Sequence, residues 1–155
     1  MKKLGTYYLK PAEVGYYGLH PSLMLDGRHV GKISEEWVAE LVGGKRQPEN
    51  FPYDVETYES EFYHEGTRLE VRSAIKDVSF ASSKEVGSGR QVTEEGFTEK
   101  LDSIDYFVIV DSREWEKGHV VFYEISKDDV YGLGLGKRKS MAVNKFWKKV
   151  TDGIK

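Results

Sequence analysis

Hydrophobic and polar positions along the chain predict a central β-sheet. The run from Tyr106 to Val110 is almost entirely apolar and β-prone, as expected for a strand covered on both faces. A second apolar run, residues 120–125, follows a turn at 115–118 and predicts the partner strand. In residues 67–75, apolar and small residues alternate with charged ones, which indicates a strand with one face toward the core. Further short strands are predicted at 5–10, 15–20, 53–63 and 78–80.

Helical spacing of apolar residues predicts the remaining elements. Residues 34–42 form an amphipathic helix that begins at Ser34 as N-cap and ends at two glycines. Residues 93–104 and 140–150 also place apolar side chains three and four positions apart, and Ser126 is typical of a helix start. The apolar face of the last helix consists of Val143, Phe146, Trp147 and Val150. The resulting order of elements predicts an α/β fold of the α+β kind, with a mixed central sheet flanked by helices.

The length of the chain indicates one domain. A chain of 155 residues can bury one ordinary hydrophobic core, so we expect a single domain over 1–155. Within it we expect an N-terminal arm over 1–33, a core over 34–131, and a glycine connector with a basic C-terminal helix over 132–155. The chain has no cysteine, which excludes disulfide scaffolds, cysteine-bound zinc and thiol nucleophiles. No segment approaches the ~20 apolar residues of a membrane span, so we expect a cytoplasmic protein without membrane contact.

Charge is unevenly distributed, although the formal net charge is only -3. Between Glu49 and Glu70, seven acids face a single basic residue, Arg68. From Gly136 onward the basic residues outnumber the acids, which reduce to Asp152. An acidic centre beside a basic tail suits a metal site next to a nucleic-acid backbone. A solvated acidic hairpin and a basic surface helix would give the same counts.

Asp54 and Glu70 are the candidate chemical groups. If the two lie on adjacent strands, their carboxylates can converge with Arg72, because residues two apart on a strand share a face. Two carboxylates, with the Val71 carbonyl as a third ligand, suit Mg²⁺, and Mn²⁺ can substitute for it. Glu56 competes with Asp54, since it lies on the same strand face. Alternatively, these acids are exposed hairpin residues that pair across the strands.

These residues resemble the PD-(D/E)XK nucleases, the superfamily of many type II restriction endonucleases. The resemblance runs from about Ser34 to Ile125 and includes an acid-bearing helix, the Asp54 segment, Leu69-Glu70-Val71-Arg72-Ser73, a helix, and the strand at 106–110. It implies a restriction-endonuclease-like core and metal-dependent cleavage of double-stranded DNA by a homodimer. Asp54 and Glu70 would hold the metal, Arg72 would stand in the place of the family lysine, and Glu36 would supply the additional helix acid of some members.

Arginine in place of lysine changes the expected chemistry. Arginine keeps its proton under ordinary conditions, so Arg72 can steady phosphate charge but is a poor general base. Three alternatives follow. The metal-bound water loses its proton to bulk solvent or to the substrate phosphate, another residue such as Lys76 or Lys84 helps, or the domain binds DNA without cutting it. A domain with no ligand at all is a further alternative.

Two polar segments are predicted to contact DNA, the loop at 82–91 and the basic run at 137–139. The small-residue loop at 82–91 lets backbone donors approach phosphates, and its arginine and glutamine can read base edges. The residues expected to contact DNA are Ser82, Ser83, Lys84, Arg90, Gln91, Lys137, Arg138 and Lys139. A polar surface loop and a glycine hinge before a basic helix are the alternatives.

Overall fold

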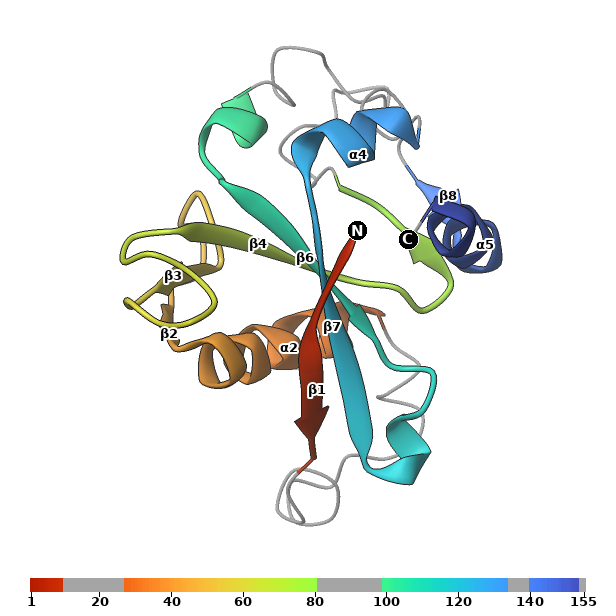
Figure 1. Ribbon diagram of the computed structural model, residues 1–155, viewed down its shortest axis with the longest axis horizontal. Helices are drawn as coiled ribbons and strands as arrows, with labels where there is room; N and C mark the ends of the chain where they lie inside the picture. Colours follow the sequence, from red (N-terminus) through yellow and green to blue (C-terminus); the bar gives the residue numbers. More distant parts are fainter. Residues whose placement is uncertain (10–26, 81–98, 134–139, 154–155) are drawn as a thin grey trace.

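A mixed six-stranded sheet forms the centre of the computed structural model, which describes residues 1–9, 27–80, 99–133 and 140–153. The strand order is β1-β7-β6-β4-β3-β2, in which β4 and β6 are parallel and all other neighbours are antiparallel (Figure 1). The strands are β1 (Lys2–Tyr8), β2 (Gly44–Arg46), β3 (Val55–Thr57), β4 (Arg68–Ser73), β6 (Tyr106–Asp111) and β7 (His119–Ile125). A second, two-stranded sheet pairs β5 (Asp77–Val78) with β8 (Met141–Ala142). The expected α/β class with a mixed sheet is therefore confirmed.

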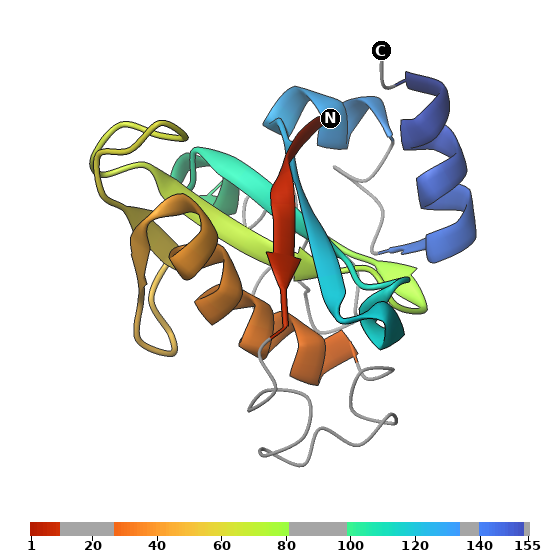
Figure 2. The same ribbon diagram turned by 60° about the horizontal axis from the view of Figure 1, so that its bottom comes forward.

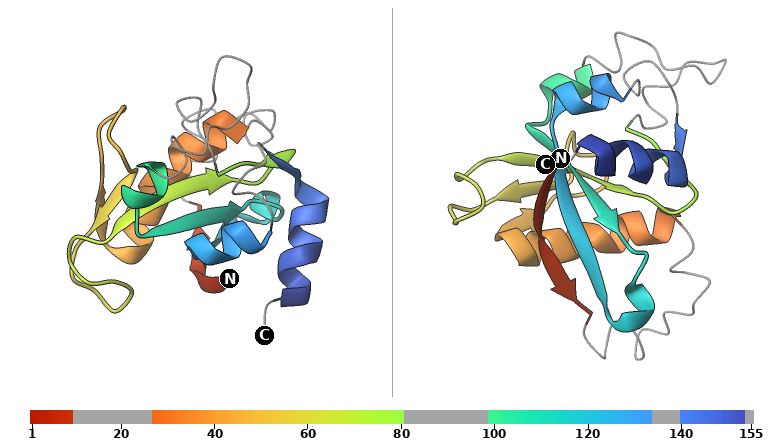
Figure 3. Two further views of the ribbon diagram at one scale, coloured as in Figure 1. Left: turned by 90° about the horizontal axis from the view of Figure 1, so that it is seen from above. Right: turned by 45° about the vertical axis from the view of Figure 1, so that its right-hand side comes forward.

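Helices cover both faces of the large sheet. Helix α2 (Gly27–Val42) packs on one face, and α4 (Lys127–Gly132) and α5 (Val143–Gly153) lie on the other side (Figures 2 and 3). A 3-10 turn, η2 (Trp115–Lys117), connects β6 to β7, and residues 99–102 are helical. No helix among the described residues combines the length and apolar character needed to cross a bilayer.

Two hydrophobic clusters follow from this layering, because side chains alternate along each strand. On β6, Val108 and Val110 face α2, whereas Phe107 and Ile109 face α4 and α5. All four side chains are fully buried, which confirms the prediction of a central strand covered on both faces.

Several predicted boundaries were wrong. Helix α2 begins at least seven residues before Ser34, which is buried in its interior and donates a hydrogen bond to the Val30 carbonyl oxygen instead of capping the helix. The strand expected over 53–63 is only the short β3. The 45–50 loop contains part of β2, and β8 precedes α5, whose first N–H, from Val143, bonds the Lys76 carbonyl oxygen at 3.0 Å.

Other predictions are confirmed. Ser126 caps α4, because its hydroxyl accepts the Asp129 N–H at 3.1 Å. The predicted apolar face of the last helix is correct for Phe146, Trp147 and Val150, which are all buried. The strand expected over 15–20 lies outside the described residues.

Candidate functional site

The candidate site lies where β3 separates from β4. Pairing of the two strands runs through Val55 opposite Leu69, and the Asp54 N–H still bonds the Leu69 carbonyl oxygen at 2.9 Å. Beyond this point the Asp54 side chain replaces the backbone as the hydrogen-bond partner of β4, since its Oδ2 accepts the Val71 N–H at 2.7 Å. Asp54 is thereby fixed against the residue that follows Glu70. The sequence spacing alone had suggested this convergence of Asp54 and Glu70.

Glu70 is buried between two cations. Its side chain is 4% exposed; its Oε1 lies 3.1 Å from Arg72 Nη1, and its Oε2 lies 2.5 Å from Lys100 Nζ. Arg72 shares the strand face of Glu70, as the spacing of two residues predicts. Lys100 acts on this carboxylate mainly through its charge.

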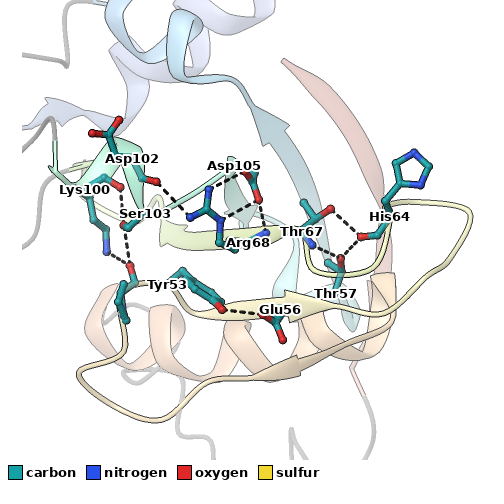
Figure 4. Close-up of polar contacts among 11 residues, drawn as sticks. Tyr53, Glu56, Thr57, His64, Thr67, Arg68, Lys100, Asp102, Ser103 and Asp105 are labelled. Atoms are coloured by element: carbon teal, nitrogen blue, oxygen red, sulfur yellow. Dashed lines mark hydrogen bonds and ion pairs between the residues drawn. The ribbon is translucent and has the colours of Figure 1, made fainter.

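Lys100 reaches the site from the helical turn at 99–102. Its Nζ also donates to the Pro52 carbonyl oxygen at 3.0 Å, and the Ser103 hydroxyl donates to the same oxygen at 3.2 Å (Figure 4). The segment before Asp54 is therefore tied to the turn that carries Lys100. Sequence reasoning missed this lysine, which lies thirty residues after Glu70 and has no motif around it.

A bidentate ion pair links the first residue of β4 to the residue that precedes β6. The Arg68 guanidinium bonds both carboxylate oxygens of Asp105, at 3.0 and 3.2 Å, and the Arg68 N–H bonds the same carboxylate at 2.8 Å (Figure 4). The Asp105 N–H returns a bond to the Arg68 carbonyl oxygen at 2.8 Å. These hydrogen bonds hold the pKa of Asp105 below its usual value. The parallel register of β4 and β6 is thus fixed at the first residue of β4.

The helix acid at the site is Glu35, one residue before the predicted Glu36. The Glu35 side chain is 15% exposed and hydrogen-bonds the Asp54 carboxyl. Glu36 is 65% exposed and reaches only Arg46, at 3.4 Å, within the described residues. Arg46 also pairs with Glu35 at 3.2 Å. Because one residue turns a helix by about 100°, the choice between these neighbours depends on the exact helical phase.

Burial raises the pKa of both central carboxyls above its ordinary value. Burial raises the pKa of Asp54 from 3.8 to about 6, and the hydrogen bond to Glu35 and the charge of Glu35 add to this, against the opposing Val71 N–H. Burial also raises the pKa of Glu70 from 4.5 to about 7, and the charge of Asp54 adds to the effect, although Arg72 and Lys100 oppose it. A cation bound by Asp54 and Glu70 would favour the ionised form of both carboxyls.

The remaining predicted residues lie apart or cannot be placed. Glu56 is exposed and accepts a hydrogen bond from the Tyr53 hydroxyl at 2.8 Å, so it does not compete with Asp54 for the site. Lys76 is exposed. The residues expected to contact DNA, namely Ser82, Ser83, Lys84, Arg90, Gln91, Lys137, Arg138 and Lys139, lie outside the described residues.

The site offers oxygen ligands, which are the type that a hard cation such as Mg²⁺ binds. Asp54 and Glu70 offer carboxylate oxygens, which are the ligands that Mg²⁺ and Mn²⁺ prefer. Over residues 1–9, 27–80, 99–133 and 140–153, no three acidic, histidine or cysteine side chains are grouped as a metal site would require. Both oxygens of Glu70 already contact cations. A metal ion shared by Asp54 and Glu70 would therefore have to displace the Lys100 ammonium.

Two cavities lie away from this cluster. One, of about 180 Å³, lies among Met1, Ile125 and Val150, and the other, of about 520 Å³, lies among Lys3, Asp111 and Tyr123. Neither is lined by Asp54, Glu70, Arg72 or Lys100. Asp54 and Glu70 thus do not belong to either cavity.

Fold and site together define a mixed α/β domain with an acid–base cluster at the point where β3 and β4 separate. This cluster consists of Glu35, Asp54, Glu70, Arg72 and Lys100. No protein-family model, curated protein or solved structure matches the chain. Function must therefore be argued from the chemistry of the cluster.

Proposed function

We propose that this protein is a metal-dependent endonuclease that hydrolyses phosphodiester bonds of double-stranded DNA, of the PD-(D/E)XK type. The observation that carries the proposal is the convergence of Asp54 and Glu70, from adjacent strands, on one buried point that also holds two cationic side chains. The order of elements supports it. Helix α2, the β2-β3-β4 meander, the helical turn at 99–102 and the parallel strand β6 follow one another as the resemblance implies.

Each residue has a defined task in this proposal. Asp54 and Glu70 would hold Mg²⁺, and the ion when bound supplies positive charge for the phosphoryl oxygens and for the attacking water. Arg72, placed beside Glu70, steadies the negative charge of the scissile phosphate. Glu35 orients Asp54 through their hydrogen bond.

The reaction exchanges one phosphorus–oxygen bond for another. The water oxygen bonds to phosphorus, and the bond from phosphorus to the departing sugar oxygen breaks. The water gives up one proton, and the sugar oxygen gains one. Cleavage of both strands of a duplex requires two such sites, so we propose a homodimer that cuts at a specific sequence.

A second candidate is a DNA-binding or interaction module with the same fold and no catalysis. The observation in its favour is that arginine stands at position 72 and that cations cover both oxygens of Glu70. In this case the cluster would hold the fold together.

Plasmid cleavage with Mg²⁺ or Mn²⁺ distinguishes the two candidates. We expect the wild type to nick or linearise the plasmid, and Asp54→Ala and Glu70→Ala to abolish cleavage. Glu61→Ala, which removes an exposed acid between β3 and β4, is the matched control and should cut normally. If the protein binds DNA but does not cut it with either Mg²⁺ or Mn²⁺, the result would support the DNA-binding module. If it does not bind DNA at low salt, the result would reject both the endonuclease and the DNA-binding module.

A further inference from the structure

Lys100 differs from Arg72, the other cation on Glu70, in the element that carries it and in its contacts. It comes from the turn at 99–102, and its side chain is only 12% exposed. Its ammonium has three donors, of which one reaches the Pro52 carbonyl oxygen and another faces Glu70 Oε2. A lysine ammonium on a flexible stem can rotate among several acceptors.

Within the described part of the chain, Arg72 has fewer polar partners than Lys100. Its Nη1 pairs with Glu70 Oε1 at 3.1 Å, while its Nε and Nη2 are buried without a hydrogen-bond partner among the described residues. The guanidinium is planar, so moving one donor moves the others with it. Of the two cations on Glu70, Lys100 has a second acceptor among the described residues, the Pro52 carbonyl oxygen.

We propose that Lys100 is a catalytic residue: its ammonium holds Glu70 before substrate binds and moves to an oxygen of the scissile phosphate during cleavage. This inference rests on the proposed nuclease function and adds Lys100 to Arg72 as a second cation for the scissile phosphate. The phosphate brings new negative charge beside Glu70, and the Pro52 carbonyl oxygen remains within reach as the second acceptor of the ammonium. A purely structural role, in which Lys100 only anchors its helical turn to the Pro52 segment, is the competing explanation.

Lys100→Gln tests the inference, because glutamine keeps donors for the Pro52 carbonyl oxygen and loses the charge. We expect the single-turnover cleavage rate with saturating Mn²⁺ to fall by about 10²-fold or more. DNA affinity, measured by anisotropy with Ca²⁺ in place of Mn²⁺, should change by less than about threefold, since one phosphate contact among many is removed. Mn²⁺ affinity, measured by calorimetry without DNA, should be retained, because the variant removes the cation that covers Glu70 Oε2.

Ser103→Ala is the matched control for the anchoring role. It removes the other hydrogen bond to the Pro52 carbonyl oxygen and the bond from the Ser103 hydroxyl to the Lys100 carbonyl oxygen at 2.7 Å, and it leaves every charge at Glu70 in place. We expect it to cut at about the wild-type rate. The double variant Arg72→Lys with Lys100→Gln returns a lysine to the cluster and should cut at least about tenfold faster than Lys100→Gln alone.

Three results would overturn the inference. These are a Lys100→Gln rate within about threefold of wild type, a Ser103→Ala loss as large as that of Lys100→Gln, or loss of Mn²⁺ binding in Lys100→Gln. Should Lys100→Gln not fold, as judged by thermal melting, Lys100→Met is measured under the same criteria. Failure of the nuclease proposal is recognised separately, because the wild type would then show no cleavage that depends on Asp54.

Discussion

Replacing Asp54 by asparagine should stabilise the protein at neutral and alkaline pH. The side chain is held by two contacts, the Val71 N–H and the Glu35 carboxyl. Asparagine can keep both, because its carbonyl oxygen accepts the first hydrogen bond and its amide group donates to the second. The substitution therefore removes a negative charge with little change of shape.

The magnitude follows from the raised pKa of Asp54. Folding raises that pKa from 3.8 to about 6, and each unit of pKa corresponds to about 1.4 kcal/mol, so ionised Asp54 destabilises the fold by about 3 kcal/mol. The sign depends on pH. Below about pH 4 the carboxyl is protonated in both the folded and unfolded states; above about pH 6 it is ionised in both, and the folded state carries the full penalty. The free energy of unfolding of the wild type therefore falls as pH rises through this range.

Urea denaturation at pH 4 and pH 8 measures this effect. The free energy of unfolding of Asp54→Asn should exceed that of the wild type by only about 0.5 kcal/mol at pH 4 and by about 3 kcal/mol at pH 8. Glu61→Gln removes an equal charge from an exposed position, so its free energy of unfolding should equal that of the wild type at both pH values. A variant that is less stable than the wild type at pH 8, or a gain that does not depend on pH, would refute the reasoning.

Two further predictions test the helix acid and the second hydrophobic cluster. Glu35→Gln should lower the pKa of Asp54 toward its ordinary value, because glutamine donates to the ionised carboxylate and adds no negative charge; carbon-detected NMR titration of Asp54 measures this, and an unchanged pKa would contradict the Glu35 contact. Phe80→Ala should destabilise the protein by about 3 to 5 kcal/mol, because Phe80 is fully buried and packs edge to face on Phe107 at 4.8 Å; a loss below about 1 kcal/mol in urea denaturation would show that this side chain does not belong to the core.

Fold prediction from the sequence succeeded where one local pattern determines the element. The run at Tyr106–Val110 is apolar at nearly every position, and such a run is stable only between two covering layers. Fold prediction failed at the start of α2, because Gly27 and Gly31 lower helix propensity and Ser34 is typical of an N-cap. Tertiary packing overrides these signals, since Val30 and Trp37 are buried on one helix face.

The site was predictable only for its local part. Asp54 and Glu70 lie on neighbouring strands, and their spacing in the sequence suggested their convergence. Glu35 was missed in favour of Glu36, because the orientation of a helix on a sheet is set by packing and not by the acids themselves. Lys100 was missed because contacts between residues distant in sequence, to the Pro52 carbonyl oxygen and to Glu70, place its helical turn at the site, and no short motif encodes them.

Charge balance within the cluster favours a metal ion over a directly bound phosphate. Glu70 pairs with two cations and Glu35 with Arg46, whereas among the described residues no Lys, Arg or His forms an ion pair with Asp54. A buried carboxylate without a cation destabilises a fold, so a purely structural cluster would be expected to pair it. A phosphate at this point would add further negative charge beside Asp54, but a divalent cation would neutralise it. If this reasoning is right, Mn²⁺ at pH 8 should raise the unfolding free energy of the wild type and leave that of Asp54→Asn nearly unchanged.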